Sequence, residues 1–226
     1  MDWNNDGSLD ILSGCYWTRE PIGADAAHLQ VLLGRGGNDF AEATTLKATN
    51  GKPILNVPHK TNLKEGERKY DLRNICTHQF AADIDADGDL DIVVGNLNTE
   101  IFLHENKGSA STPVFDETGA TLTTMVDNKT APHLYDWDGD GDLDLLSGSG
   151  QGGVYLAMNV GDAKSPQWSK FETLILAADV GGRMSKVHVT DWNADGTPDV
   201  VVGCQAGLSG MVSVFLGVEP PTRTPR

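Results

Sequence analysis

A thirteen-residue pattern that occurs four times constrains the fold of this chain more than any other feature. The copies begin at Asp2, Asp83, Asp136 and Asp191, and each has aspartate at positions one, five and nine and glycine at positions six and thirteen. Position three is aspartate in the second and third copies and asparagine in the first and fourth. A repeat that recurs about every fifty residues indicates a propeller or a solenoid.

The first half of each copy has the chemistry of a metal-binding loop. Oxygen ligands at alternate positions of a tight turn suit a hard cation, and Ca²⁺ is the usual occupant of a flexible cage of about six to eight oxygens. The glycine at position six supplies the left-handed backbone that folds the loop back on its ion. The second half, such as residues 90–94, is a short β-branched apolar run that predicts a buried strand.

An EF-hand begins with the same residues, but the rest of the pattern excludes one. An EF-hand loop ends in a glutamate at position twelve and has helices on both sides. Position twelve here is Ser13, Val94, Ser147 or Val202, and the flanking residues are β-branched. The aspartate at position nine therefore serves as the final carboxylate, and the residue at position seven contributes its backbone carbonyl.

The strong negative charge of the chain comes largely from these loops. The formal net charge is −15, and the four loops contain 16 of the 32 acidic residues. No basic cluster suggests nucleic acid, no apolar run is long enough for membrane insertion, and the N-terminus has no signal peptide. If the protein is exported, its signal lies upstream or has been removed. We expect Cys15, Cys76 and Cys204 to be buried, unpaired thiols.

The segments between the copies predict one four-stranded antiparallel blade per repeat. In the second repeat the strands are expected at 77–82, 90–94, 100–104 and near Phe115. The first repeat lacks a strand before its loop and the last lacks a fourth strand, which gives three, four, four and three strands. The predicted blades are about 1–46, 75–122, 131–178 and 185–218, with an exposed inserted loop at about 47–74 and a Pro-rich disordered tail at 219–226.

The sequence therefore predicts an all-β propeller with about four blades present. It is expected to be part of a larger propeller, such as a seven-bladed one, or an incomplete ring that another chain completes. A self-closed four-bladed ring is the third option, and it would leave two incomplete sheets with exposed edges.

The four copies resemble the FG-GAP or VCBS-type repeat, the calcium-binding blade motif of integrin α-subunit propellers and of many bacterial surface and secreted proteins. The resemblance implies up to four Ca²⁺ ions and a location outside the cytoplasm (secreted, periplasmic or cell surface). The chain differs from the family at Trp3, Trp137 and Trp192, where Phe is common, and at Pro198 of the fourth loop. The implied metal ligands are Asp2, Asn4, Asp6, Ser8 and Asp10; Asp83, Asp85, Asp87, Asp89 and Asp91; Asp136, Asp138, Asp140, Asp142 and Asp144; and Asp191, Asn193, Asp195, Thr197 and Asp199.

Ligand charge ranks the four loops. Loops two and three offer carboxylates at positions one, three, five and nine, whereas loops one and four offer three carboxylates and an amide. We therefore predict tighter Ca²⁺ binding in loops two and three, and the weakest binding in loop one, whose preceding strand is missing. A hydrogen-bonded aspartate turn without metal is the alternative for loops one and four.

A few residues outside the ligand set are candidates for a second role. His133 and His188 each lie three residues before a motif and either line a central channel as part of a ligand site or, as we favour, pack between blades. The tryptophans at position two are expected to wedge between neighbouring blades. Tyr16, Trp17 and Trp168 lie outside the motif and are candidates for an exposed aromatic platform.

These observations favour a non-catalytic recognition module that binds a carbohydrate or a protein through its loops or channel mouth. The sequence contains no nucleophile elbow, phosphate loop or His-rich zinc motif. The alternative is the propeller domain of a secreted polysaccharide lyase or another sugar-active enzyme. A passive adhesion repeat within a longer cell-surface protein is a third interpretation, because the fold alone does not decide function.

Overall fold

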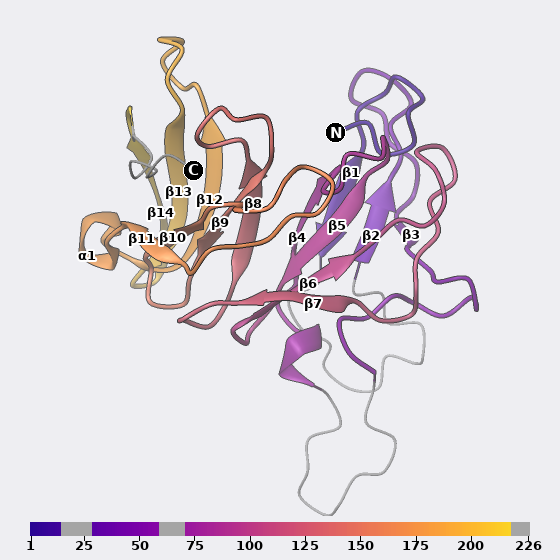
Figure 1. Cartoon of the computed structure of the whole chain (residues 1–226), viewed down its shortest axis with the longest axis horizontal. Helices are drawn as coiled ribbons and strands as arrows, with labels where there is room; N and C mark the ends of the chain where they lie inside the picture. Colours follow the sequence, from indigo (N-terminus) through magenta and orange to yellow (C-terminus); the bar gives the residue numbers. More distant parts are fainter. Residues whose placement is uncertain (15–28, 59–70, 218–226) are drawn as a thin grey trace, which may run out of the picture. The chain divides into compact units, whose positions relative to one another are not determined.

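The computed structural model describes residues 1–14, 29–58 and 71–217. Its contacts divide the chain into two compact units, Met1–Pro132 and His133–Arg226. The described residues form four antiparallel sheets, with one short helix, α1 (Ala177–Val180), and one 3-10 turn, η1 (Leu72–Asn74) (Figure 1). The predicted all-β class is therefore confirmed.

Each sheet is a meander in which strands that are consecutive in the chain are also neighbours in space. The described strands number three, four, four and three, as the sequence predicts. The first sheet contains β1 (Ile11–Gly14), β2 (Leu29–Leu32) and β3 (Thr44–Thr45). The second contains β4 (His78–Ala82), β5 (Asp91–Gly95), β6 (Glu100–His104) and β7 (Ala120–Thr124). The third contains β8 (Ala131–Tyr135), β9 (Asp144–Gly148), β10 (Val154–Ala157) and β11 (Glu172–Ile175). The fourth contains β12 (Arg183–Thr190), β13 (Asp199–Ala206) and β14 (Ser209–Phe215).

The prediction of a strand near Phe115 is wrong. The fourth strand of the second sheet is β7, and Phe115 lies in the loop before it. The Phe115 side chain is 2% exposed, and its ring stacks on Trp3 with the ring centroids 6.0 Å apart. Phe115 therefore serves the core between the first two sheets, whereas the Thr-rich, mostly exposed β7 carries no apolar signal.

The inserted segment at 47–74 is not an exposed loop in its described parts. Ile54 is 1% exposed and belongs to the same core as Trp3 and Phe115. The Leu55 amide donates to the Glu117 carbonyl at 2.8 Å. The segment therefore contributes to the hydrophobic core and, through Leu55, pairs with the residues just before β7. Residues 59–70, with the whole of the charged run KEGERK, lie outside the described residues.

Neighbouring sheets within each unit pack through the same motif positions. In the second unit, Trp137 and Leu146 at positions two and eleven share a core with Val200 and Val202 at positions ten and twelve of the next repeat. The first unit uses the same four positions: Trp3, Leu12, Ile92 and Val94. The predicted wedging of tryptophan between sheets is therefore confirmed for Trp3 and Trp137.

The fourth sheet leaves its equivalent face uncovered, and the prediction for Trp192 is wrong. Trp192 is 63% exposed, because none of the described residues packs a further sheet against it. Val212, which pairs with Gly203 as Val154 pairs with Gly148, is 68% exposed, whereas Val154 is fully buried. The motif therefore retains core-type residues on a face that the described chain does not bury.

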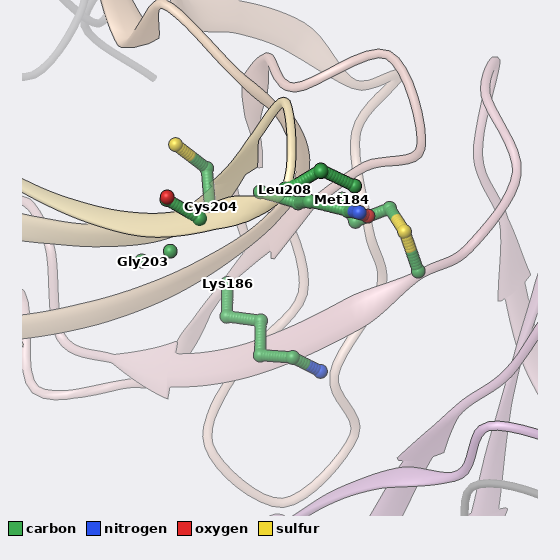
Figure 2. A pocket seen from close by; sticks show the side chains of 8 residues that line it. Met184, Lys186, Gly203, Cys204 and Leu208 are labelled. Carbon is green, nitrogen blue, oxygen red and sulfur yellow. The ribbon is translucent and has the colours of Figure 1, made fainter.

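The glycine at position thirteen shows the same difference. A Cβ at Gly14, Gly95 or Gly148 would overlap a backbone carbonyl oxygen six residues before the next motif, at Thr77, Thr130 or Ser185 respectively. Around Gly203 no described atom lies within 4 Å of such a Cβ. A pocket of about 370 Å³ lies there instead (Figure 2), with Met184, Lys186, Gly203, Cys204 and Leu208 among its lining residues.

Two of the three cysteines can be placed. Cys76 and Cys204 are buried thiols that form no disulfide, as expected, and Cys15 lies outside the described residues. Among the described residues, no helix has the length and apolar character that crossing a membrane requires.

Candidate metal centre

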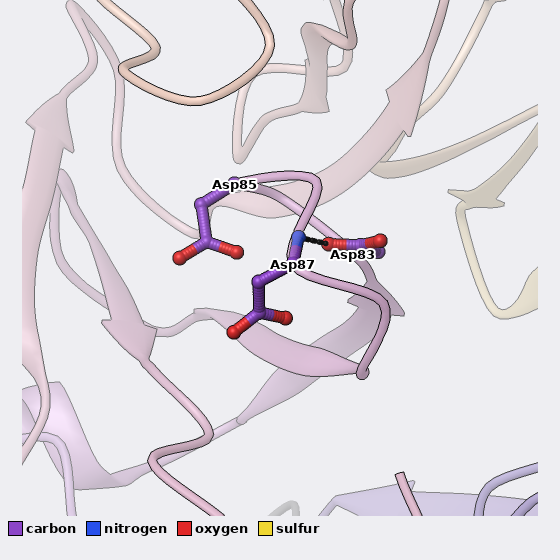
Figure 3. Close-up of side chains that lie close together, drawn as sticks. All are labelled: Asp83, Asp85 and Asp87. Carbon is purple, nitrogen blue, oxygen red and sulfur yellow. Dashed lines mark hydrogen bonds between the residues drawn. The ribbon is translucent and has the colours of Figure 1, made fainter. Parts of the chain in front are cut away.

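Loop two brings three carboxylates together between β4 and β5. Oxygens of Asp83, Asp85 and Asp87 lie within 4.8 Å of one another (Figure 3). The two oxygens of Asp83 accept the backbone amides of Asp87 and Gly88, each at 3.0 Å. Gly88 has a φ of +98°, the left-handed conformation that the pattern predicts for position six. The turn therefore points successive carboxylates toward one centre.

Loop three forms the second carboxylate group, between β8 and β9. Oxygens of Asp136, Asp138 and Asp144 lie within 4.8 Å of one another. Asp136 accepts the amide of Gly141 at 3.1 Å, as Asp83 accepts that of Gly88. Among the described His, Cys, Asp and Glu residues, these are the two groups of three whose ligand atoms lie this close together. The structure therefore gathers acidic side chains most closely in loops two and three.

Several carboxylate oxygens in these two loops are buried without a hydrogen-bond donor. They are one oxygen each of Asp85, Asp89 and Asp136. A carboxylate oxygen that is hidden from water and receives no N–H is costly, because ionised groups depend on solvation or pairing. A divalent cation with oxygen ligands would satisfy such oxygens, so the residues fit Ca²⁺.

The electrostatics of loop two also favour a bound cation. Burial, followed by the negative charges of Asp87, Asp85 and Asp83, raises the pKa of Asp89. Burial raises the pKa of Asp91 to about 7, against the opposing effect of backbone amides that donate to it. A divalent cation beside Asp89 and Asp91 would offset these effects, because its charge favours the ionised form of both carboxylates.

Loops one and four satisfy their carboxylates internally. The Asn4 side-chain amide donates to Asp6 at 3.0 Å, and the Asn193 amide donates to Asp195 at 2.8 Å. These side-chain hydrogen bonds are the main reason that the pKa values of Asp6 and Asp195 are lowered. An amide donor at position three thus supplies part of the charge compensation that a cation would supply in loops two and three. The ranking of the four loops stays a prediction.

Position seven follows one backbone pattern in all four loops. Its N–H is accepted by the carboxylate at position five, which pairs Ser8 with Asp6, Asp89 with Asp87, Asp142 with Asp140, and Thr197 with Asp195. The side chains differ: Ser8 is partly buried, whereas the Asp89 and Asp142 side chains are each 8% exposed. The position-seven side chain is therefore more buried in loops two and three, and its role as a metal ligand stays a prediction.

The aspartate at position nine has a structural role that the sequence reasoning missed. Each of these aspartates accepts two backbone amides. One comes from motif position two. The other comes from a residue just beyond the next strand of the same sheet (β2, β6, β10 or β14). The first set of donors is Trp3, Ile84, Trp137 and Trp192, at 2.7, 3.2, 3.0 and 2.8 Å. The second set is Gly34, Asn106, Asn159 and Gly217, at 2.6, 2.7, 2.7 and 2.7 Å. The acceptors Asp10, Asp91, Asp144 and Asp199 are at most 5% exposed.

The two asparagines in that second set also escaped the sequence analysis. Asn106 and Asn159 each lie 23 residues after the first aspartate of their motif, with glycine two residues later and proline seven residues later. This second pattern, NxGxxxxP, was visible in the sequence. It was missed because it lies outside the acidic motif.

Of the two histidines, His133 is buried and packs between sheets, whereas His188 is exposed. His133 is 4% exposed and accepts the backbone amide of Val189 at 3.2 Å. Its ring meets that of His188 edge to face, with centroids 4.8 Å apart. Burial, and then His188, lowers the pKa of His133 to about 3. His133 thus joins the third and fourth sheets, which is the favoured of the two interpretations.

The proposed aromatic platform is not supported where it can be assessed. Trp168 is partly buried and forms a β-bridge with Asn159. Tyr16 and Trp17 lie outside the described residues.

A comparison with known families adds independent evidence. The sequence model of the FG-GAP-like repeat matches residues 83–147 and 136–202, which together span more than half of the 226 residues. The chain belongs to the FG-GAP-like repeat family. The matched FG-GAP-like stretch contains loops two and three and the whole of loop four. A search of curated proteins finds no sequence that matches this chain.

Proposed function

We propose that this FG-GAP-like chain is a calcium-stabilised recognition module. Ca²⁺ would be held in loop two by Asp83, Asp85, Asp87 and Asp91, and in loop three by the residues at the same four positions: Asp136, Asp138, Asp140 and Asp144. The supporting observation is the set of buried carboxylate oxygens without donors in these loops. Bound Ca²⁺ supplies positive charge and crosslinks the turn, which stabilises the folded chain because the unfolded chain cannot assemble the cage.

We assign loops one and four to weaker calcium sites. Their ligand sets are Asp2, Asn4, Asp6 and Asp10, and Asp191, Asn193, Asp195 and Asp199, with Ser8 and Thr197 at position seven. Each contains one carboxylate fewer than loops two and three, and the asparagine already donates to the carboxylate at position five. An ion in these loops would have to displace that hydrogen bond.

The module would bind a carbohydrate or a protein, and act without catalysis. Rigid blades with loops at their ends are suited to recognition, because the sheet fixes the loops in space. Two histidines that an enzyme could have used, His104 and His133, are buried, and burial lowers their pKa values to about 4 and about 3. The competing function, a domain of a polysaccharide lyase or another sugar-active enzyme, would require convergent acid–base groups elsewhere in the chain.

A second polypeptide is a further partner that we propose. The face of the fourth sheet that carries Trp192 and Val212 is exposed, whereas the same face of the third sheet is buried. Another chain with a sheet of this repeat type would cover it and extend the array of blades. A location outside the cytoplasm accords with FG-GAP repeats, which are typical of extracellular proteins, and with the calcium concentration there.

Calcium titration by calorimetry tests the metal assignment. Asp87→Ala and Asp140→Ala each remove a carboxylate from the two strongest sites, so each should weaken the tightest binding at least about tenfold. Asp39→Ala, an exposed carboxylate outside the loops, is the matched control and should leave binding unchanged. Equal affinities in all four proteins would refute the sites.

A glycan and polysaccharide array tests the recognition role. The purified chain is applied once in calcium and once in EGTA, and then with Asp87→Ala. Signals that require calcium and fall in the variant support a calcium-dependent lectin-like module. Release of shortened sugars from a bound polysaccharide would support the lyase alternative, and a blank array would favour a protein partner.

A further inference from the structure

Asn106 organises a nine-residue loop that follows the third strand of the second sheet. Its side-chain oxygen accepts the amides of Gly108 at 3.0 Å and Val114 at 2.9 Å. Its side-chain nitrogen donates to the Ser109 carbonyl at 3.4 Å. The Lys107 amide closes the loop by donating to the Val114 carbonyl at 2.8 Å. One buried side chain thus ties both ends and the middle of the loop together.

Asn159 repeats this arrangement in the third sheet. Its side-chain oxygen accepts the amides of Gly161 at 2.9 Å and Gln167 at 3.0 Å, and its nitrogen donates to the Asp162 carbonyl at 3.4 Å. The Val160 amide donates to the Gln167 carbonyl at 2.6 Å. The same four hydrogen bonds at the same offsets show that both repeats build this loop in the same way.

Both loops are anchored on a candidate calcium ligand. The backbone amide of Asn106 donates to one oxygen of Asp91, and that of Asn159 donates to one oxygen of Asp144, each at 2.7 Å. A carboxylate oxygen has two lone pairs, so it can accept this N–H and coordinate a cation at the same time. The asparagine loop and the calcium loop therefore share one carboxylate.

Within each of these two sheets, the asparagine loop and the calcium loop lie at the same end. β5 leads away from the calcium loop and the antiparallel β6 returns toward it, so Asn106 emerges beside that loop. In the third sheet, β9 and β10 bring Asn159 back in the same way. Movement of the shared carboxylate on metal binding would therefore act on a neighbouring surface loop directly.

We propose that Asn106 and Asn159 are positioning residues through which calcium orders the loops 107–114 and 160–167. The inference rests on the proposed calcium binding of loops two and three. Bound Ca²⁺ fixes Asp91 and Asp144 as ligands, these carboxylates hold the asparagine amides, and the asparagine side chains hold the loops. Each of these two blades thus presents a second loop whose order depends on its ion.

The two outer repeats lack this device. The residue that donates to the position-nine aspartate is Gly34 in the first repeat and Gly217 in the fourth. Glycine offers the backbone amide but has no side chain to gather a loop. Calcium-dependent ordering is therefore expected in the second and third blades, the same blades whose loops contain four ligand carboxylates.

Trypsin provides a site-resolved test, because each loop contains one exposed lysine, Lys107 or Lys164. In the full-length protein, calcium should slow cleavage after both lysines about tenfold relative to EGTA. Asn106→Ala should abolish the protection at Lys107 and leave Lys164 protected, and Asn159→Ala should do the reverse. Cleavage after Arg35, in the first repeat, is the internal reference, and Asn128→Ala is the matched control variant on an exposed asparagine.

Calorimetry on the same samples separates this inference from the function on which it rests. If the parent binds no calcium, the proposed function fails. If it binds calcium but Lys107 and Lys164 are cleaved at equal rates with and without the ion, only the loop coupling is overturned. If Asn106→Ala does not fold, Asn106→Asp provides the test, because it keeps the side-chain oxygen that accepts from Gly108 and Val114. This variant should retain the protection of Lys107 by calcium. Loss of protection in folded Asn106→Asp would contradict the role of that oxygen.

Discussion

The carbonyl oxygen of Ser185 lies against Gly148 so closely that a side chain on Gly148 would overlap it. The contact joins the third sheet to the strand that opens the fourth, and the Ser185 hydroxyl fixes it by accepting the Ser149 amide at 2.8 Å. Thr130 does the same for Asn96 at 2.9 Å. The glycine that ends the first three motifs is therefore a packing residue.

Gly148→Ala should destabilise the protein by about 1–3 kcal/mol, because the strands must move apart to admit the methyl group. Gly203→Ala introduces the same change where no described atom lies within 4 Å, so it should be neutral or slightly stabilising. Urea unfolding of the two variants and the parent measures the difference. Equal losses at both glycines would show that Gly203 is covered in solution.

The tryptophans at motif position two should differ in the same way. Trp137 is 3% exposed and Trp192 is 63% exposed. Trp137→Ala should cost about 3–5 kcal/mol because it leaves a cavity in the core, whereas Trp192→Ala should cost less than about 1 kcal/mol. Thermal and urea unfolding, both in excess calcium, provide the measurement. A large loss at Trp192 would indicate that another sheet buries it.

Acid should destabilise the fold through His133. Its pKa in the folded protein is about 3, below the ordinary 6.5, so the unfolded chain takes up a proton at a higher pH than the folded chain. Stability is therefore full above pH 6.5 and falls as the pH drops from 6.5 toward 3.

His133→Leu isolates this effect. At about pH 7.5 the variant should be less stable by roughly 1–3 kcal/mol, because the Val189 amide loses its acceptor. The deficit should shrink at lower pH, since the variant has no imidazole to protonate. His188→Leu, on the exposed partner ring, is the control. A deficit that stays constant from about pH 7.5 to about pH 4.5 would contradict the assigned cause.

The sequence predicts the strands well and the contacts between them poorly. The strand predicted at 90–94 is found one residue later, as β5, because a β-branched run between a glycine turn and a closing glycine has few alternatives. The predicted position of the fourth strand fails at Phe115. A single aromatic residue cannot show whether it belongs to a strand or to the core that two sheets share.

For the candidate metal site, too, the sequence predicts the local features and misses the long-range contacts. Alternating aspartates and the left-handed Gly88 are local features, so the turn could be inferred from the sequence. The double hydrogen bonding of Asp91 depends on Asn106, which approaches only after β5 and β6 have paired. The difference between Trp137 and Trp192 depends on what covers each sheet, and identical motif positions give no information about that.

Asn193→Asp should convert loop four toward the type of loops two and three. The substitution adds a fourth carboxylate and removes the amide that donates to Asp195 at 2.8 Å. In EGTA the loop then gathers like charges without the side-chain amide that offsets them, so the melting temperature should fall. In calcium the additional carboxylate should raise the affinity of this site about tenfold, because ligand charge tunes calcium loops. Asp138→Asn in loop three is the matched reverse change and should weaken binding there. Calorimetry and thermal unfolding in both buffers measure the two effects, and variants that match the parent in calcium and in EGTA would show that position three does not face an ion.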